Sequence, residues 1–397
     1  MTAPAGPVTT GSVATRPTVP ATRYGDRLAA AQELTAGRGV GGLLVGVGAD
    51  LRYLTGYAAM PLERLTMLVL PAVGRATLVA PRLESMRAAA SPAAAAGLVD
   101  LVAWDETEDA HAIAAARLGS RRVGPPDRVL VSDGLWAMHV LALQRALPGA
   151  EFGLATEVLR DLRMAKDADE VALLRLAAQA ADRALAAVAS GRLVGRSEAD
   201  VSREIRDRLV GEGHDEASFA IVGSGPNGAS PHHEPGERSI AAGEPVVLDI
   251  GGLLGGYGSD VTRTIWVGGP RRVVPDPAFV EVHDLVRRAN AAATSIVRPG
   301  VTAEAVDAAA RAVITAGGHG PAFLHRTGHG IGLEGHEEPY LVAGNAEPLR
   351  DGSAFSIEPG IYLEGRFGVR IEDIVVCRPT GPDVLNELSR ERWTVSG

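Results

Sequence analysis

Four carboxylates in this 397-residue chain stand inside segments that are otherwise apolar and prone to form strands. Asp249 follows the run VVL, Asp260 precedes VTRTIWV, and Glu358 and Glu372 lie in FSIEPG and VRIED. A carboxylate among core residues is costly unless it is paired, hydrogen-bonded or bound to a metal. The fold therefore has to bring these acids to partners of opposite charge.

The four acids belong to a sequence pattern that occurs twice. A helical pattern begins at Ser197 and another at Thr302, 105 residues later, each with a hydroxyl at the N-cap and acids in the first turn. The two acids of the first half recur in the second at offsets of 109 and 112 residues. Three concordant offsets favour a duplicated unit of helix, helix and hairpin over chance. Period-two alternation on facing strands can bring both acids of a unit to one surface.

Histidines near the third acid indicate a metal site. Three of them fall within HRTGHGIGLEGHEEP, residues 325–339, where the interleaved glycines suit a backbone that passes close to another group. Imidazole with several carboxylates is a ligand set for a divalent transition ion. Four carboxylates balance two such ions, which in dinuclear sites lie roughly 3.5 to 4 Å apart and lower the pKa of a water between them. The alternative is a buried ion-pair network with Arg263 and Arg370.

Composition excludes several classes of function. The chain has 39 basic and 48 acidic residues, a net charge of −9 and no long basic run, which argues against nucleic acid or an anionic membrane as a partner. No stretch reaches the roughly 18 apolar residues that span a bilayer, so we expect a soluble protein. Cys377 is the only cysteine, which rules out an intramolecular disulfide and a zinc site built from several thiolates.

Three regions follow from the pattern along the chain. Residues 1–22 are rich in Pro, Thr, Ala and Gly and lack the features of a signal peptide, which predicts a disordered tail and a cytoplasmic protein. From 23 to 160, short apolar runs alternate with Ala-rich helical stretches, as in an α/β domain. A long amphipathic helix capped by Asp167 or Asp169 then introduces a second domain, residues 161–397.

Four motifs of the second region resemble those of a known enzyme family. VVLDIGGLLGGYGSDVTRTIWVG, GHGIGLEGHEEP, SIEPGIY and GVRIEDIVV, in this order and spacing, look like the motifs of the pita-bread metallopeptidases, in the proline peptidase branch of aminopeptidase P and prolidase. ADLRYLTGY, residues 49–57, resembles the amino-terminal domain of these enzymes and of creatinase more loosely. The resemblance implies an α+β fold, with a duplicated pita-bread catalytic domain behind a smaller α/β domain, and a homodimer.

The resemblance also implies the roles of individual metal-site residues. Asp249 is expected to chelate one ion, Asp260 and Glu372 to bridge two, and His329 and Glu358 to complete the shell of the second. Glu358 is also the expected proton shuttle. The cofactor would be two divalent ions, with Mn²⁺ favoured and Co²⁺, Zn²⁺ or Fe²⁺ as alternatives.

Around the metals, the resemblance implies a substrate cleft. His232 and His336 match catalytic histidines beside the substrate, and His336 would help to stabilise the tetrahedral intermediate. His325 matches a cleft residue, with a structural role as the alternative. Arg370 is expected on the substrate side, more as a partner of the ligand carboxylates than as a clamp, whereas His233 is predicted to be a solvated loop residue.

The implied reaction is hydrolysis of Xaa-Pro bonds in short proline-containing peptides by a metal-bridging hydroxide, either as an aminopeptidase or as a dipeptidase. One alternative is a non-peptidase hydrolase on the same scaffold, because a fold does not fix a function. Another is a non-catalytic binding protein of the same fold. Assays with proline peptides distinguish the first alternative, and metal analysis distinguishes the second.

Overall fold

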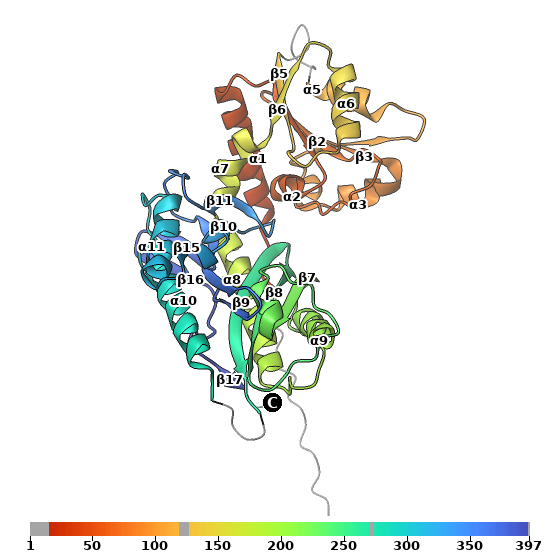
Figure 1. Cartoon of the computed structure of the whole chain (residues 1–397). Helices are drawn as coiled ribbons and strands as arrows, with labels where there is room; N and C mark the ends of the chain where they lie inside the picture. The colour runs from red at the N-terminus through yellow and green to blue at the C-terminus, as the bar shows by residue number, and fades with distance from the viewer. Residues whose placement is uncertain (1–15, 119–126, 270–273, 396–397) are drawn as a thin grey trace, which may run out of the picture.

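The computed structural model describes residues 16–118, 127–269 and 274–395, which form a smaller and a larger body (Figure 1). The smaller body is built on a six-stranded sheet in the order β4-β3-β2-β1-β5-β6. Strand β2 is antiparallel to β1 and β3, and the other neighbouring pairs are parallel. Its elements are α1 (Ala21–Gly37), β1 (Gly42–Gly46), α2 (Ala49–Thr55), β2 (Met67–Pro71), β3 (Thr77–Pro81), α3 (Ser85–Ala89), α4 (Pro92–Ala95), β4 (Asp100–Trp104), α5 (Ala110–Leu118), β5 (Arg128–Val131), α6 (Ala137–Ala146), β6 (Glu151–Leu154) and α7 (Thr156–Met164).

Helices cover both faces of this sheet, which explains why its central strands are apolar along their whole length. Leu43 and Val45 of β1 pack with helices α1, α2, α4 and α7 on one face. Leu44, which lies between them, packs with α5 and α6 on the other face. The period-two alternation of a strand therefore distributes one apolar run between two layers of helix.

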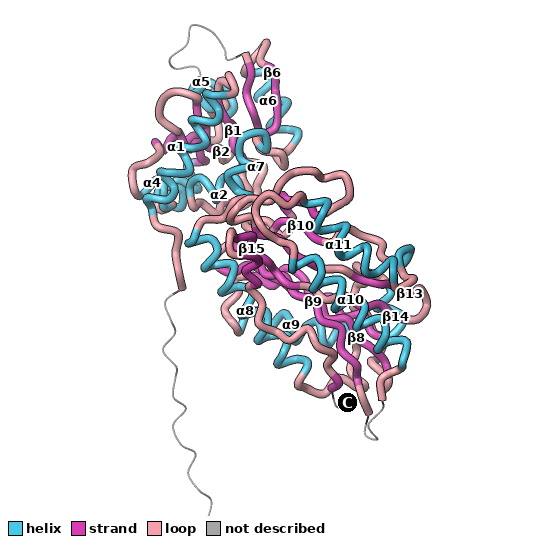
Figure 2. Tube along the Cα trace, turned by 90° about the vertical axis from the view of Figure 1, so that its left-hand side faces the viewer, coloured by secondary structure: helices cyan, strands magenta, loops and turns pink. Residues whose placement is uncertain are grey.

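The larger body places its sheets between two helix pairs (Figure 2). Helices α8 and α9 pack on the sheet β17-β9-β8-β7, and α10 and α11 pack on the sheet β11-β10-β12-β15-β16 and the hairpin β13-β14. Its elements are α8 (Ala168–Ala189), α9 (Glu198–Gly211), β7 (Glu216–Ser224), η2 (Gly225–Ala229), β8 (Glu244–Leu254), β9 (Tyr257–Val267), α10 (Pro277–Ser295), α11 (Ala303–Ala316), η3 (Gly320–Ala322), β10 (Gly328–Gly330), β11 (Glu337–Leu341), β12 (Ala354–Ile357), β13 (Gly360–Leu363), β14 (Phe367–Arg370), β15 (Asp373–Arg378), β16 (Gly381–Val384) and β17 (Thr394–Val395).

The two halves of the larger body repeat the same structural devices. Ser197 and Thr302 each cap their helix, α9 or α11, and each also forms an isolated bridge with a later segment. Asp182 in α8 and Asn290 in α10, 108 positions apart, are both buried and bind backbone groups of later segments. One difference between the halves is that the hairpin β13-β14 is inserted between β12 and β15, which pair directly with each other.

The tail was predicted to comprise residues 1–22, of which residues 1–15 lie outside the described part of the chain. Helix α1 begins at Ala21, and Arg16 donates to Asp215 Oδ1 at 2.7 Å and to the Gly213 carbonyl at 2.6 Å. Residues 16–22 therefore belong to the folded structure, which corrects the predicted end of the tail. Within the described ranges, no helix combines the length and apolar character needed to cross a membrane.

Helix α8 begins with a complete capping box, and of the two predicted caps Asp167 is the one used. Its side chain accepts from the backbone N–H groups of Asp169 and Glu170, and Glu170 accepts from the Asp167 N–H in return. Asp167 also pairs with Arg27 of α1 at 3.2 Å. This cap therefore fixes the point where the chain passes from one body to the other.

We expect Asp167→Ala to lower the free energy of unfolding by about 1 to 2 kcal/mol, because the N-cap bonds are lost. Asp169→Ala is the matched control, since that side chain is partly exposed and makes only a surface pair with Arg23, and it should cost about 0.5 kcal/mol or less. Urea denaturation followed by circular dichroism measures both. Equal effects of the two substitutions would show that the capping box does not stabilise this junction.

Candidate active site

The five predicted metal ligands all line one cavity of about 500 Å³ in the larger body. Asp249 lies on β8, Asp260 on β9 and His329 on β10, while Glu358 directly follows β12 and Glu372 lies between β14 and β15. The other side chains that line the cavity include all of the predicted substrate residues, His232, His325, His336 and Arg370, together with Phe219, Ile221, Pro231 and Arg326.

Strand register explains why the acids share this cavity. In the hairpin β8-β9, Asp249 is opposite Thr262 and Asp260 is opposite Gly251, so the two acids are diagonal neighbours on one face. Gly255 and Gly256, at φ 63° and 91°, form the tight turn that sets this register. The halves are joined at Thr262, whose carbonyl accepts from the Glu372 N–H at 3.1 Å and whose hydroxyl donates to Glu372 Oε2 at 2.6 Å.

Glycines let the segment with His329 approach its neighbours closely. A Cβ atom at Gly328 would overlap the Ser356 carbonyl, and one at Gly330 would overlap the Glu338 carbonyl. His329 itself donates its backbone N–H to the Ser356 hydroxyl at 3.1 Å. Substituting either glycine would therefore displace His329 from the carboxylates.

The donor set fits a metal. Ligand atoms of Asp260, His329 and Glu372 lie within 4.8 Å of one another, and His329 Nε2 is 3.4 Å from Glu358 Oε1. Three buried carboxylate oxygens of this cluster have no hydrogen-bond partner among the described residues, namely Asp249 Oδ1, Asp260 Oδ1 and Glu372 Oε1. Buried polar atoms are almost always satisfied, so orphaned oxygens that face one cavity indicate a missing cation.

The pKa shifts of the ligand side chains also indicate a site for a cation. Burial, and then repulsion from neighbouring carboxylates, raises the pKa of Asp260 and of Glu372 well above the ordinary range. Burial raises the pKa of Glu358 to about 7, and burial beside His336 lowers the pKa of His329 to about 3. Neutral imidazole is the form that binds metals, and a divalent ion would offset the repulsion that disfavours ionised carboxylates.

Arg370 is tied to the protein by several groups at once. Its side chain pairs with Asp249 and donates to the Tyr362 hydroxyl at 2.7 Å and to the Pro231 carbonyl at 3.4 Å. The Tyr362 hydroxyl is also 2.7 Å from His325 Nε2. Arg263, the other predicted counter-charge, instead pairs with Asp373 at 2.6 Å, so it does not neutralise the four acids.

The loop that carries His232 is held by a buried carboxylate that sequence reasoning missed. Glu198, at the start of α9, accepts from the backbone N–H and hydroxyl of Ser224, from Asn227 Nδ2 and from His233 Nε2 at 2.7 Å. The prediction that His233 is a solvated loop residue is therefore wrong, because its ring pairs with a fully buried partner.

The second half uses the same device at Asp307 of α11. Its Oδ1 accepts from the backbone N–H of Thr327 at 3.1 Å and from the Thr327 hydroxyl at 2.8 Å. The Thr327 carbonyl in turn accepts from the Glu358 N–H. Thus each half has a buried helix carboxylate that binds the backbone N–H and the hydroxyl of one residue, Ser224 or Thr327.

Asn290 binds the backbone next to the second pair of acids, Glu358 and Glu372. Its Nδ2 donates to the carbonyls of Ile357, at 2.8 Å, and Ile371, at 3.1 Å, the residues immediately before Glu358 and Glu372. Asn290 is fully buried in α10 and lies outside the sequence motifs. Its partners are 67 and 81 positions away, so no local pattern could have identified it.

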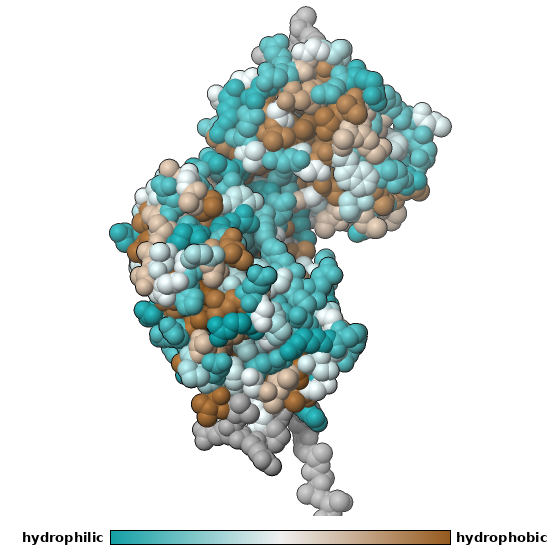
Figure 3. All heavy atoms as spheres, viewed as in Figure 1, coloured by the Kyte–Doolittle hydropathy of each residue, from teal (hydrophilic) through white to brown (hydrophobic). Residues whose placement is uncertain are grey.

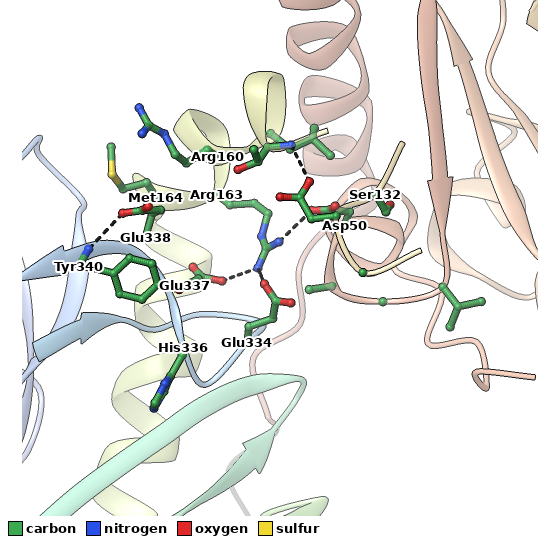
Figure 4. A pocket seen from close by; sticks show the side chains of 17 residues that line it. Asp50, Ser132, Arg160, Arg163, Met164, Glu334, His336, Glu337, Glu338 and Tyr340 are labelled. Carbon is green, nitrogen blue, oxygen red and sulfur yellow. Dashed lines mark hydrogen bonds and ion pairs between the residues drawn. The ribbon is translucent and has the colours of Figure 1, made fainter. Parts of the chain in front are cut away.

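A second cavity, of about 560 Å³, lies where the two bodies meet, and His336 is one of the residues that line it. The surface around this junction is mostly hydrophilic (Figure 3). Arg163 occupies the centre of the cavity and bonds Asp50 of the smaller body as well as Glu334 and Glu337, which flank His336 (Figure 4). Glu337 is also paired with Lys166, the only lysine of the chain. This network connects the smaller body to the segment that carries His336.

We expect Asn290→Ala to weaken metal binding about 10- to 100-fold, as for other groups that orient ligands through hydrogen bonds. Asn345→Ala is the control, since Asn345 also donates to a backbone carbonyl, that of Tyr340, but does not line the cavity. Calorimetric titration of the apo-proteins with Mn²⁺ measures both affinities. Unchanged binding in Asn290→Ala would exclude this positioning role.

Glu337→Gln should destabilise the protein by about 3 to 5 kcal/mol at pH 7, because Lys166 stays buried without its partner. Burial raises the pKa of Glu337, but Lys166 and Arg163 outweigh burial and hold that pKa below its ordinary value. The carboxyl of Glu337 has an ordinary pKa of about 4.3 in the unfolded chain and a lower pKa in the folded protein. The stabilisation from the charged carboxylate is therefore complete above about pH 4.3 and is lost as the pH falls through the lower pKa of the folded state.

The difference in denaturation midpoint between the native protein and Glu337→Gln should accordingly shrink from pH 7 toward pH 3. Glu334→Gln is the control, because Glu334 binds the same arginine with a side chain that is 52% exposed. A pH-independent difference for Glu337→Gln would show that charge is not what Glu337 contributes.

Comparison with known proteins agrees with this geometry. Residues 172–379 match the metallopeptidase family M24, and residues 27–165 match the creatinase/prolidase N-terminal domain. The chain is 48% identical to the probable dipeptidase PepE of Mycobacterium bovis, over 93% of this chain and 96% of that protein. It is 33% identical to the Xaa-Pro dipeptidase of Lactobacillus delbrueckii subsp. lactis, over 86% and 91% of the two chains.

The crystal structure of dipeptidase PepE from Mycobacterium ulcerans superposes with a TM-score of 0.89 at 47% identity, covering 96% of this chain and 100% of that one. The predicted pita-bread catalytic fold behind a smaller amino-terminal domain is thus confirmed, and so is the predicted proline peptidase resemblance. The chain is an enzyme that belongs to the metallopeptidase family M24.

Proposed function

We propose that this enzyme hydrolyses Xaa-Pro bonds in short peptides with two divalent ions held in the 500 Å³ cavity. The observation that carries the proposal is the set of orphaned carboxylate oxygens beside a neutral imidazole. The names of the relatives support the substrate class, since they include a probable dipeptidase and an Xaa-Pro dipeptidase.

Asp249 would hold one ion, Asp260 and Glu372 would be shared by the two ions, and His329 and Glu358 would hold the other ion. Oxygen and imidazole ligands favour Mn²⁺, with Co²⁺, Zn²⁺ and Fe²⁺ as alternatives. Ions in such a site lower the pKa of the attacking water and polarise the scissile carbonyl.

The chain's own residues supply the proton transfers and the orientation of the substrate. An Xaa-Pro bond is a tertiary amide, so its leaving nitrogen has to gain a proton. Glu358 lines the same cavity and would take the proton of the attacking water and deliver it to that nitrogen. His232 and His336 line the same cavity from two different segments and can donate hydrogen bonds to the substrate carbonyl.

His325 and Arg370 complete the proposed substrate side. His325 orients the Tyr362 hydroxyl, which in turn accepts from Arg370, and Arg370 holds Asp249. These contacts favour an indirect part for Arg370, through Asp249, over direct binding of the peptide. The expected homodimer and cytoplasmic location stay predictions.

Asp260→Asn should lose both bound metal and Xaa-Pro hydrolysis, because Asp260 is one of the two carboxylates proposed to touch both ions. Native protein should hold about two equivalents of metal that a chelator removes, and the variant fewer. Elemental analysis and release of proline from Ala-Pro measure the two properties.

The control is Asp284→Asn, because Asp284 is a partly exposed acid of α10 that pairs with neighbouring arginines, and the substitution should change neither property. Near-native hydrolysis by Asp260→Asn would contradict the mechanism. Metal binding by the native protein without any hydrolysis of proline peptides would instead favour a different hydrolase reaction on this scaffold.

A further inference from the structure

The segment that carries His232, residues 225–236, is tied to the protein on both sides of that histidine. His232 itself is exposed at the wall of the active-site cavity. The carbonyl of Pro231, the residue before it, accepts from both terminal nitrogens of Arg370 at 3.4 Å. His233, the residue after it, is bonded at Nε2 to Glu198 Oε2 at 2.7 Å. Residue 232 is therefore held between two anchors, one from each half of the larger body.

The anchor from the first half is a carboxylate outside the cavity. Glu198 is fully buried at the start of α9, which packs against strands β7 and β8 (Figure 1). Its Oε1 accepts from the backbone N–H and the hydroxyl of Ser224, and both of its oxygens lie 3.1 Å from Asn227 Nδ2. Neither Glu198 nor His233 lines the active-site cavity. The hydrogen bonds of Glu198 thus hold the segment of His232 without touching the site itself.

Glu198 binds this segment as an ionised acceptor. Burial alone would raise the pKa of its carboxyl, but the hydrogen bonds from Ser224, His233 and Asn227 outweigh burial and hold that pKa below its ordinary value. A carboxylate has no proton to donate, so His233 has to present its Nε2–H to Glu198. Bonds to an ionised acceptor are roughly twice as strong as bonds between neutral groups.

The segment between the bonded residues is short and closely packed. The N–H of Ser230 donates to the Asn227 carbonyl at 3.1 Å, and the N–H of His233 donates to the Ser230 carbonyl at 3.2 Å. Glu198 binds the side chains at both ends of these two successive turns, Asn227 and His233. A Cβ atom at Gly368 of β14 would overlap the Gly228 carbonyl, so the segment also lies directly on β14. A shift at His233 would therefore be passed to His232.

We propose that Glu198, through His233, is a positioning residue for His232. This inference rests on the proposed function, in which His232 donates a hydrogen bond to the substrate carbonyl. It adds a buried carboxylate on which turnover depends and on which metal binding does not depend. A misplacement of about 1 Å at a group that acts in the reaction can lower the rate about 100-fold, so Glu198 can control kcat without contacting the peptide.

The first test is His233→Ala, which breaks one anchor and leaves the bonds of Glu198 to Ser224 and Asn227. On the metal-loaded enzyme, kcat for Ala-Pro should fall about 10- to 100-fold with KM nearly unchanged, because the lost interaction acts in the transition state. His233→Gln should recover part of kcat, since its amide N–H can still donate to Glu198. Glu198→Gln should lose at least as much as His233→Ala. Calorimetry should find the native affinity for Mn²⁺ in all three variants.

A double-mutant cycle separates positioning from a general weakening of the fold. If His233 acts through His232, then His233→Ala should cause almost no further loss of kcat in a His232→Ala background. A merely structural effect would lower kcat by the same factor in both backgrounds. That equality, or a native kcat in His233→Ala, would overturn the inference while leaving the proposed function intact.

Hydrogen–deuterium exchange followed by mass spectrometry gives a readout that does not depend on activity. The backbone amides of residues 225–236 should exchange faster in His233→Ala than in the native protein, because the segment opens more often. His139→Ala is the control, since that ring is also buried and hydrogen-bonded, to His111 at 3.1 Å, but does not line the active-site cavity. It should change neither kcat nor the exchange of residues 225–236.

The exchange measurement also separates the two proposals if the native enzyme does not hydrolyse Ala-Pro. Faster exchange confined to residues 225–236 in His233→Ala would then support Glu198 as the anchor of the His232 segment, while the absent hydrolysis rejects the peptidase function. Unchanged exchange would reject the anchor as well.

Discussion

Mutual repulsion among buried carboxylates is the constraint on which this structure depends. Asp249, Asp260, Glu358 and Glu372 share one cavity, and among the described residues only Asp249 has an arginine as a direct counter-charge, Arg370. The raised pKa values of the other three record the cost of burying them without a cation. A bound divalent cation would offset this cost, as in sites where metal binding and folding are coupled.

The duplicated scaffold keeps the acids in place against that repulsion. Glu198 and Asp307 each bind the hydroxyl of one residue, Ser224 or Thr327, and Asn290 binds the backbone carbonyls of the residues that precede two of the acids. All three come from helices, which are rigid supports at a distance from the reacting groups. The smaller body adds a further constraint through Arg163 and the segment of His336.

The sequence predicted the parts of the site that carry local patterns. Acids inside apolar strands and glycines around His329 have a physical meaning that can be read from neighbouring residues, and they led to the cavity that the structure contains. Asn290 and Glu198 could not be found in this way, because their meaning depends on partners that are distant in the chain. His233 was misjudged for the same reason, since its partner belongs to another helix.

The four acids of the cavity are proposed to hold two divalent ions. Anomalous diffraction from crystals of the protein soaked in Mn²⁺ tests this assignment most directly. Two peaks are expected in the cavity, roughly 3.5 to 4 Å apart, with Asp260 and Glu372 touching both. An empty cavity in which the acids bind only protein groups and water, under conditions that saturate metal elsewhere, would contradict it.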